Sequence, residues 1–167
     1  MTQSETHGTD KSSSTTETIY RGSSDAGFRE AQRTVTKETV SAGRTVLDTT
    51  DYEPGSENGA LQFQERRVST TSSTPDGNLS SIVDVYAPSA DGTVRDPEAA
   101  PQIKQEQIIT HIKKPDGSVV DTFSVREPSV SDPTKLGDAK QVTQTVCTGK
   151  CDTPPAGVPA APVPAKQ

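Results

Sequence analysis

Two stretches of the chain, residues 79–85 and 119–125, carry large apolar side chains at alternate positions. A period of two places such side chains on one side of a β-strand. Val, Ile and Thr are frequent around both stretches, and these residue types suit a pleated surface. The alternating positions are Leu79, Val83 and Val85 in the first stretch and Val119, Phe123 and Val125 in the second. Strands with one modestly apolar face are therefore predicted here.

The two stretches belong to a repeat whose clearest marker is a Pro-Asp-Gly turn. Proline presets a negative φ and glycine accepts a positive one, so this tripeptide favours a tight turn. The second turn follows the first at an offset of 40 residues, and a weaker match at an offset of 34 places Tyr52 on Tyr86. The predicted turn residues are Gly43, Pro75, Asp76, Gly77, Pro115, Asp116 and Gly117.

The repeat predicts a mainly β fold. Three antiparallel hairpins are expected at about 31–52, 61–87 and 102–127, with a period of about 34–40 residues. Residues 140–147 are expected to add a half-repeat. Together they predict a thin, extended or open sheet, a shape that is rarely stable alone. The chain divides into a Ser/Thr-rich arm (1–27), the hairpin region (28–152) and a Pro/Ala-rich tail (153–167).

The register of the hairpins stays open at this point. A two-residue Asp-Gly loop pairs Val68 with Val85 and Ile108 with Val125, which apolar matching favours. A three-residue Pro-Asp-Gly loop suits the proline better and shifts the pairing by one residue. The candidate interaction face comprises Leu79, Val83, Val85, Ile108, Val119, Phe123 and Val125.

Residues 24–40 have a helical alternative. Phe28, Ala31 and Val35 lie near helical spacing, and Ser24 or Asp25 is a suitable N-cap. The Thr and Val content of the second half of this segment favours a strand instead.

Both ends of the chain are of low complexity. Residues 1–25 hold twelve Ser or Thr, and Ile19 is their only large aliphatic residue. Such a segment buries too little to offset the entropy of ordering, so we expect it to be disordered or ordered by a partner. The tail favours extended polyproline II, as a spacer or as a ligand for an aromatic groove.

Composition and charge restrict the class of partner. Hydrophobic residues make up 28% of the chain and aromatic residues 4%, too few for a closed core. The net charge of −6 is spread thinly, with no basic stripe to neutralise phosphates, so nucleic acid is not an expected partner. No apolar run approaches the ~20 residues of a membrane span. No signal peptide is visible after Met1, and the localisation stays open.

Motifs for catalysis or cofactors are not found. The sequence contains no HExxH, GxSxG or GxGxxG pattern and no regular series of calcium ligands. His7 lies in the Ser/Thr-rich arm, and His111 lies within a predicted strand, where a half-exposed structural histidine is expected. Tyr52 and Tyr86 are expected to pack over the hairpin bases. We therefore predict no enzyme activity and no cofactor or metal.

The cysteines are the sharpest local feature. Cys147 and Cys151 enclose Thr148-Gly149-Lys150, a spacing that a glycine-containing turn closes into a disulfide. Free thiols are the alternative. A disulfide favours an extracytoplasmic or cell-surface setting, which conflicts with the missing signal peptide.

These observations predict a non-catalytic structural or accessory subunit. Its hairpins and extended ends would bind and brace other protein subunits of a larger assembly. Peripheral association with a membrane complex is compatible with this function. Two alternatives stay open: a self-assembling fibre or surface-layer subunit, and a small adhesion or ligand-binding β module.

Overall fold

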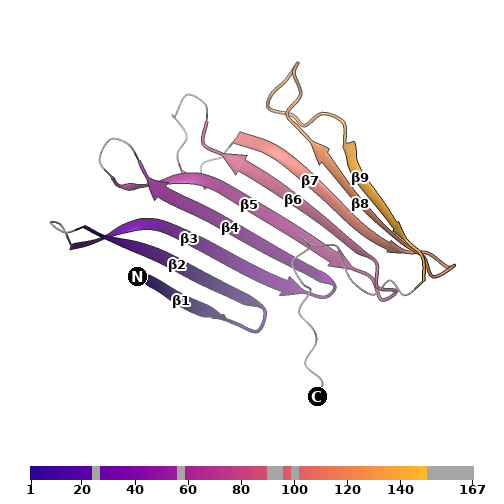
Figure 1. Ribbon diagram of the computed structural model, residues 1–167, viewed down its shortest axis with the longest axis horizontal. Helices are drawn as coiled ribbons and strands as arrows, with labels where there is room; N and C mark the ends of the chain where they lie inside the picture. Colours follow the sequence, from indigo (N-terminus) through magenta and orange to yellow (C-terminus); the bar gives the residue numbers. More distant parts are fainter. Residues whose placement is uncertain (24–26, 56–58, 90–95, 99–101, 150–167) are drawn as a thin grey trace.

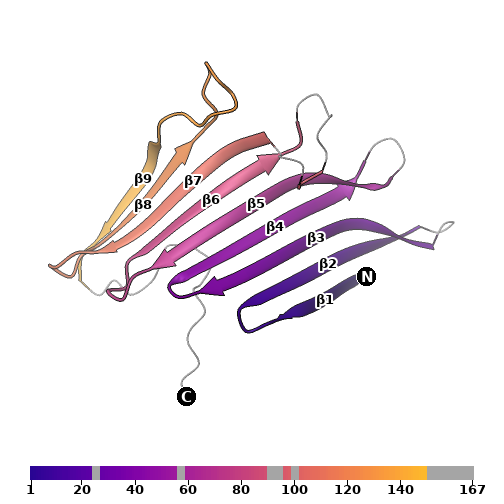
Figure 2. The same ribbon diagram turned by 180° about the vertical axis from the view of Figure 1, so that it is seen from behind.

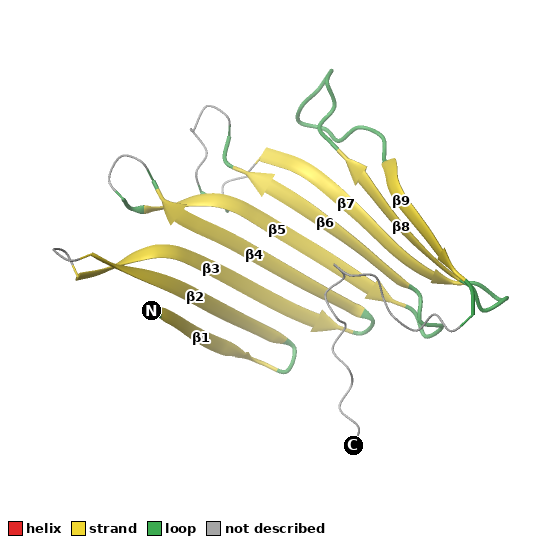
Figure 3. Cartoon of the chain, viewed as in Figure 1, coloured by secondary structure: helices red, strands yellow, loops and turns green. Residues whose placement is uncertain are grey.

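A single antiparallel sheet makes up the fold. The computed structural model describes residues 1–23, 27–55, 59–89, 96–98 and 102–149. Within these ranges there are nine strands and no helix (Figures 1 and 3). The strands are β1 (Thr2–Thr9), β2 (Ser12–Ser23), β3 (Gly27–Ser41), β4 (Arg44–Pro54), β5 (Leu61–Ser73), β6 (Leu79–Ala87), β7 (Gln102–Lys113), β8 (Val119–Arg126) and β9 (Lys140–Cys147).

The strands lie side by side in chain order, so that each pairs only with its neighbours in the sequence. Figures 1 and 2 show them from opposite sides as one twisted layer, with β1 at one edge and β9 at the other. The right-handed twist of individual strands accumulates across such an open sheet. The all-β prediction is confirmed, and the last predicted extended piece coincides with β9. The segment with the helical alternative is strand β3.

The turns of the β5–β6 and β7–β8 hairpins have the same geometry. In the first, the Thr74 amide donates to the Asn78 carbonyl (3.0 Å) and the Gly77 amide to the Thr74 carbonyl (2.9 Å). The loop therefore contains three residues, Pro-Asp-Gly, and Lys114 and Ser118 close the second loop in the same way. Gly77 and Gly117 have φ values of 81° and 80°, as the turn chemistry predicts.

The three-residue loop decides the register. It places Arg67 opposite Val85 and Gln107 opposite Val125. The pairing of Ile108 with Val125, expected from the two-residue loop, is wrong. A shift of one residue moves a side chain to the other face of a sheet, so Ile108 lies on the face opposite Val125.

A one-residue irregularity recurs at every junction between one hairpin and the next. The register shifts at Ile19/Tyr20, Asp51/Tyr52, Val85/Tyr86 and Phe123/Ser124. In each case the odd-numbered strand carries one extra residue, which is the definition of a β-bulge. Tyr20, Tyr52 and Tyr86 thus occupy equivalent positions, each directly after the point at which the neighbouring strand carries its extra residue.

The N-terminal segment differs from the expectation of a disordered arm. Residues 2–9 and 12–23 form β1 and β2 and extend the sheet. Backbone hydrogen bonds do not depend on apolar side chains, and cross-strand hydroxyl pairs add to them. Thr6 and Thr15 lie opposite each other with their hydroxyls 3.0 Å apart. The predicted Pro/Ala-rich tail, 153–167, lies outside the described residues.

Buried apolar side chains are few. Among the described residues they are Phe63, Val85, Val119 and Val120. All four lie in β5, β6 and β8, in the C-terminal part of the sheet. The apolar packing of the sheet is therefore concentrated in this part.

Candidate interaction surface

The two faces of the sheet differ in the side chains that they carry. Paired residues of an antiparallel sheet share a face, so the register assigns the sides. We call face A the face with Leu79, Val83, Val85, Val119, Phe123 and Val125, and face B the opposite one. Six of the seven predicted interaction residues therefore share a face. Ile108 is the exception and lies on face B beside Ile82.

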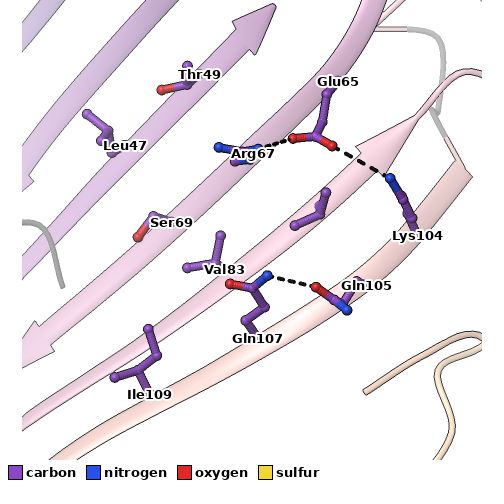
Figure 4. A pocket seen from close by; sticks show the side chains of 11 residues that line it. Leu47, Thr49, Glu65, Arg67, Ser69, Val83, Lys104, Gln105, Gln107 and Ile109 are labelled. Atoms are coloured by element: carbon purple, nitrogen blue, oxygen red, sulfur yellow. Dashed lines mark hydrogen bonds and ion pairs between the residues drawn. The ribbon is translucent and has the colours of Figure 1, made fainter. Parts of the chain in front are cut away.

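A shallow groove of about 610 Å³ lies on face A across β4–β7 (Figure 4). Its apolar lining residues are Leu47 from β4, Val83 and Val85 from β6, and Ile109 from β7. The lining residues are Leu47, Thr49, Glu65, Arg67, Ser69, Val83, Val85, Lys104, Gln105, Gln107 and Ile109. An apolar floor with polar sides is typical of a surface that contacts another chain.

Charged and amide side chains surround one end of this groove. The Glu65 carboxylate pairs with Arg67 Nη2 at 2.5 Å and with Lys104 Nζ at 3.8 Å, across the intervening strand β6. The Gln107 amide donates to Gln105 Oε1 at 2.7 Å. Lys104 is the extra residue of the bulge at Val85/Tyr86, which places it beside Gln105 on face A. The bulge thereby adds a positive charge to the groove.

Face B is partly covered by residues 96–98 of the β6–β7 connection. Arg66 binds both carboxylate oxygens of Asp48, at 2.9 and 2.7 Å, and donates through Nη1 to the Pro97 carbonyl at 3.0 Å. Glu98 pairs with Lys37 of β3 at 3.6 Å. These contacts hold residues 96–98 across β3 and β5, whereas no described segment lies over the groove on face A. Face A is therefore the better candidate for binding a partner.

Tyr52 and Tyr86 lie on face B near this covering segment. Burial raises the pKa of the Tyr52 hydroxyl, and the negative charge of Asp96 raises it further. Burial also raises the pKa of Tyr86, together with the charge of Asp84. Both rings are half-buried, in agreement with a structural role beside the hairpin bases.

An acidic pair lies on face B next to Tyr86. Asp84 of β6 and Glu106 of β7 are directly opposite each other. Burial raises the pKa of Asp84, and the charge of Glu106 and a hydrogen bond to it act in the same direction. Arg126 Nη1 donates to Glu106 at 3.0 Å and compensates part of the charge.

His111 is buried, with 5% of its surface exposed, rather than half-exposed as expected. Its Nδ1 lies 2.6 Å from the Asp121 carboxylate on the neighbouring strand. Nucleophilic catalysis would require a hydroxyl or thiol on the other ring nitrogen. None of the hydrogen bonds within the described ranges joins a hydroxyl to this ring. His7, in contrast, is exposed and contacts Glu5 at 2.8 Å.

The remaining predicted residues are the cysteines. Cys147 is the last residue of β9, opposite Val119, and Cys151 lies outside the described residues. The disulfide therefore stays a prediction. The described residues form no group of three or more metal-ligating side chains, and they include no helix long and apolar enough to cross a membrane.

Of the residues that line the groove, sequence reasoning singled out only Val83 and Val85, and it missed among others Leu47, Lys104, Gln105 and Ile109. Ile109 follows from the register, since the three-residue loop turns it and not Ile108 to face A. Lys104 had no local signal because its side depends on the bulge. Comparison with protein-family models, curated proteins and solved structures finds no match for this chain.

Proposed function

We propose that the chain is a non-catalytic structural or accessory subunit that binds other protein subunits through its open sheet. The observation that supports this most directly is the uncovered groove on face A, where apolar side chains lie among polar ones. Sheets with one apolar face normally pack that face against another layer. In the described part of the chain no second layer is present, so another protein would supply it. The edges of β1 and β9 offer further backbone donors and acceptors.

We also propose that the sheet is built from copies of one hairpin unit. The recurrence of the bulge at the same junction supports this, together with the shared Pro-Asp-Gly turn. Repeats of this kind contact only their neighbours and create extended binding surfaces. Such a surface would brace a larger assembly without a deep pocket.

Chemical cross-linking in native material, followed by mass spectrometry, tests the proposed function. We expect cross-links from Lys104 at the groove to one or a few other proteins. Purified alone, the chain should show a low free energy of unfolding in urea. Absence of such cross-links, together with stable two-state folding of the isolated monomer, would contradict the proposal.

A groove variant makes the test more specific. Val83→Asp places a charge on the floor of the groove and should abolish the cross-links from this face. Thr70→Asp, on face B of the adjacent strand β5, is the matched control, because it adds the same charge on the opposite face. An equal loss of cross-links in both variants would show that the partner does not bind specifically at the groove on face A.

A further inference from the structure

The two edges of the sheet have different chemistry. The edge strand β1 contains Glu5, His7 and Gly8, and all its side chains are exposed. The other edge strand, β9, has no acidic residue, no glycine and no proline, and four of its eight residues are Val or Thr. Val142 and Val146 on β9 are 57% and 55% exposed. Edges without charges or prolines are the ones that pair with another strand, and residues 141–147 of β9 carry neither.

An apolar row on face B ends at the β9 edge. Ile112, Val120 and Val146 lie directly opposite one another on β7, β8 and β9. Val120 is buried within the row, whereas Ile112 and Val146 are exposed. A strand added to β9 would cover the free side of Val146.

Five residues within β9 read the same in both directions about Gln144, and Val142 among them is the extra residue of the bulge at Phe123/Ser124. Residues 142–146 are Val-Thr-Gln-Thr-Val, with Gln144 in the middle. In an antiparallel pair of two such strands centred on Gln144, Thr143 lies opposite Thr145 of the other copy. Both threonines lie on face A, since they pair with Phe123 and Asp121. The two Gln144 side chains then lie together on face B, where Gln144 pairs with Thr122.

The strand count favours the same arrangement. Nine alternating strands make β1 and β9 run in the same direction. Head-to-tail addition of β1 to β9 would introduce a parallel pair into an antiparallel sheet. Pairing β9 with β9 about a two-fold axis keeps every pair antiparallel and is self-complementary. It also places Lys140 of one copy at the opposite end from Lys140 of the other.

We propose that the β9 edge binds the β9 edge of a second copy, so that two chains form one continuous sheet with both A faces on the same side. This inference rests on the proposed function and assigns the partner at one edge. The hydrogen bonds of an added strand supply affinity, and the reciprocal Thr143–Thr145 pairs on either side of Gln144 supply register.

Light scattering of the full-length chain during size exclusion tests the inference. We expect a concentration-dependent dimer in the micromolar range. Gln144→Lys sets two like charges opposite each other and should raise the dimer dissociation constant by about tenfold or more. Gln144→Glu should do the same. An equimolar mixture of the two variants should restore the dimer, which also shows that neither variant is unfolded. Ser4→Lys, on the β1 edge, should leave the dimer unchanged.

Several results would overturn the inference: a wild-type monomer, an open-ended polymer, a dimer insensitive to Gln144→Lys, or no recovery on mixing. Each of these leaves the proposed function standing if the groove cross-links are found. A dimer without groove cross-links would support the β9 pairing and contradict the proposed function. The two failures are therefore distinguishable.

Discussion

The N-terminal strands β1–β3 and the later strands β5–β8 belong to one sheet but are stabilised differently. The β2–β3 ladder runs along the whole of β2, from Ser12 to Ser23. Of the described side chains on β1–β3, Thr18 alone is buried. In contrast, eight described side chains on β5–β8 are buried: Phe63, Ser69, Thr71, Ser81, Val85, His111, Val119 and Val120.

The difference separates two contributions that usually occur together. Backbone hydrogen bonds continue across all nine strands, but each is worth only about 1 kcal/mol net. Apart from Thr18, the buried side chains among the described residues of the strands lie in the later strands. We therefore expect the stability of the whole sheet to depend mainly on β5–β8, whereas β1–β3 contribute little beyond their backbone hydrogen bonds.

The largest expected effect is that of Phe63→Ala. Phe63 is 3% exposed, and its removal leaves a cavity that should lower the free energy of unfolding by about 3–5 kcal/mol. Phe28 of β3 is 69% exposed, and Phe28→Ala should change it by less than about 0.5 kcal/mol. Urea unfolding followed by circular dichroism measures both. Similar losses in the two variants would remove the contrast between the regions.

The two histidines give the next comparison. His111→Ala leaves the Asp121 carboxylate without its buried partner and should cost about 2 kcal/mol. His7→Ala breaks an exposed contact with Glu5 and should cost less than about 0.5 kcal/mol. The same unfolding measurement applies. A loss in His7→Ala as large as in His111→Ala would show that β1 contributes more to stability than its exposure indicates.

A smaller effect is expected from backbone strain at the β7–β8 turn. A side chain at Gly117 would meet no atom within 4 Å, but the positive φ of 80° is unfavourable for any β-branched residue. Gly117→Val should cost more than about 1 kcal/mol. Gly137→Val is the control, because its added carbon meets Glu127 O at an ordinary 3.5 Å and no positive φ is required. An unchanged unfolding midpoint for Gly117→Val would contradict the hairpin geometry.

The smallest effect is a change in pH dependence at Asp84. The folded pKa of Asp84 lies above its ordinary value of 3.8, so the folded state binds more protons between the two values. Stability is therefore highest below the ordinary value and falls as pH rises through the folded pKa. Asp84→Asn should remove this fall and stabilise the sheet at neutral pH.

Asp116 provides a control of opposite sign. Hydrogen bonds from the Ser118 hydroxyl and amide lower the pKa of Asp116. The stabilisation that Asp116 contributes is present above its ordinary pKa of 3.8 and is lost as pH falls through the lowered pKa of the folded state. Asp116→Asn should therefore reduce stability at neutral pH and not in strong acid. Unfolding midpoints across the acid range, measured for both variants, check the two signs; the same sign in both would refute this account.

The sequence predicted the later strands well because their apolar residues alternate. The positions of β5–β8, the turn glycines and six residues of face A follow from that pattern. β1 and β2 could not be predicted in this way, since their Ser and Thr side chains carry no apolar period. Ile108 was assigned to the wrong face because apolar matching favoured a two-residue loop. The position of Lys104 in the groove depends on the bulge in β7, and no residue type in the sequence predicts that bulge.

The chain-order connectivity of the sheet has a consequence for synthesis. Because every strand pairs only with its sequence neighbours, the fold has low contact order and can grow strand by strand. During translation β1 and β2 leave the ribosome before the apolar strands, although a polar two-stranded hairpin is marginally stable at best. They would not form stable strands until the apolar strands emerge. Folding of the nascent chain would therefore proceed from the later strands back to β1 and β2.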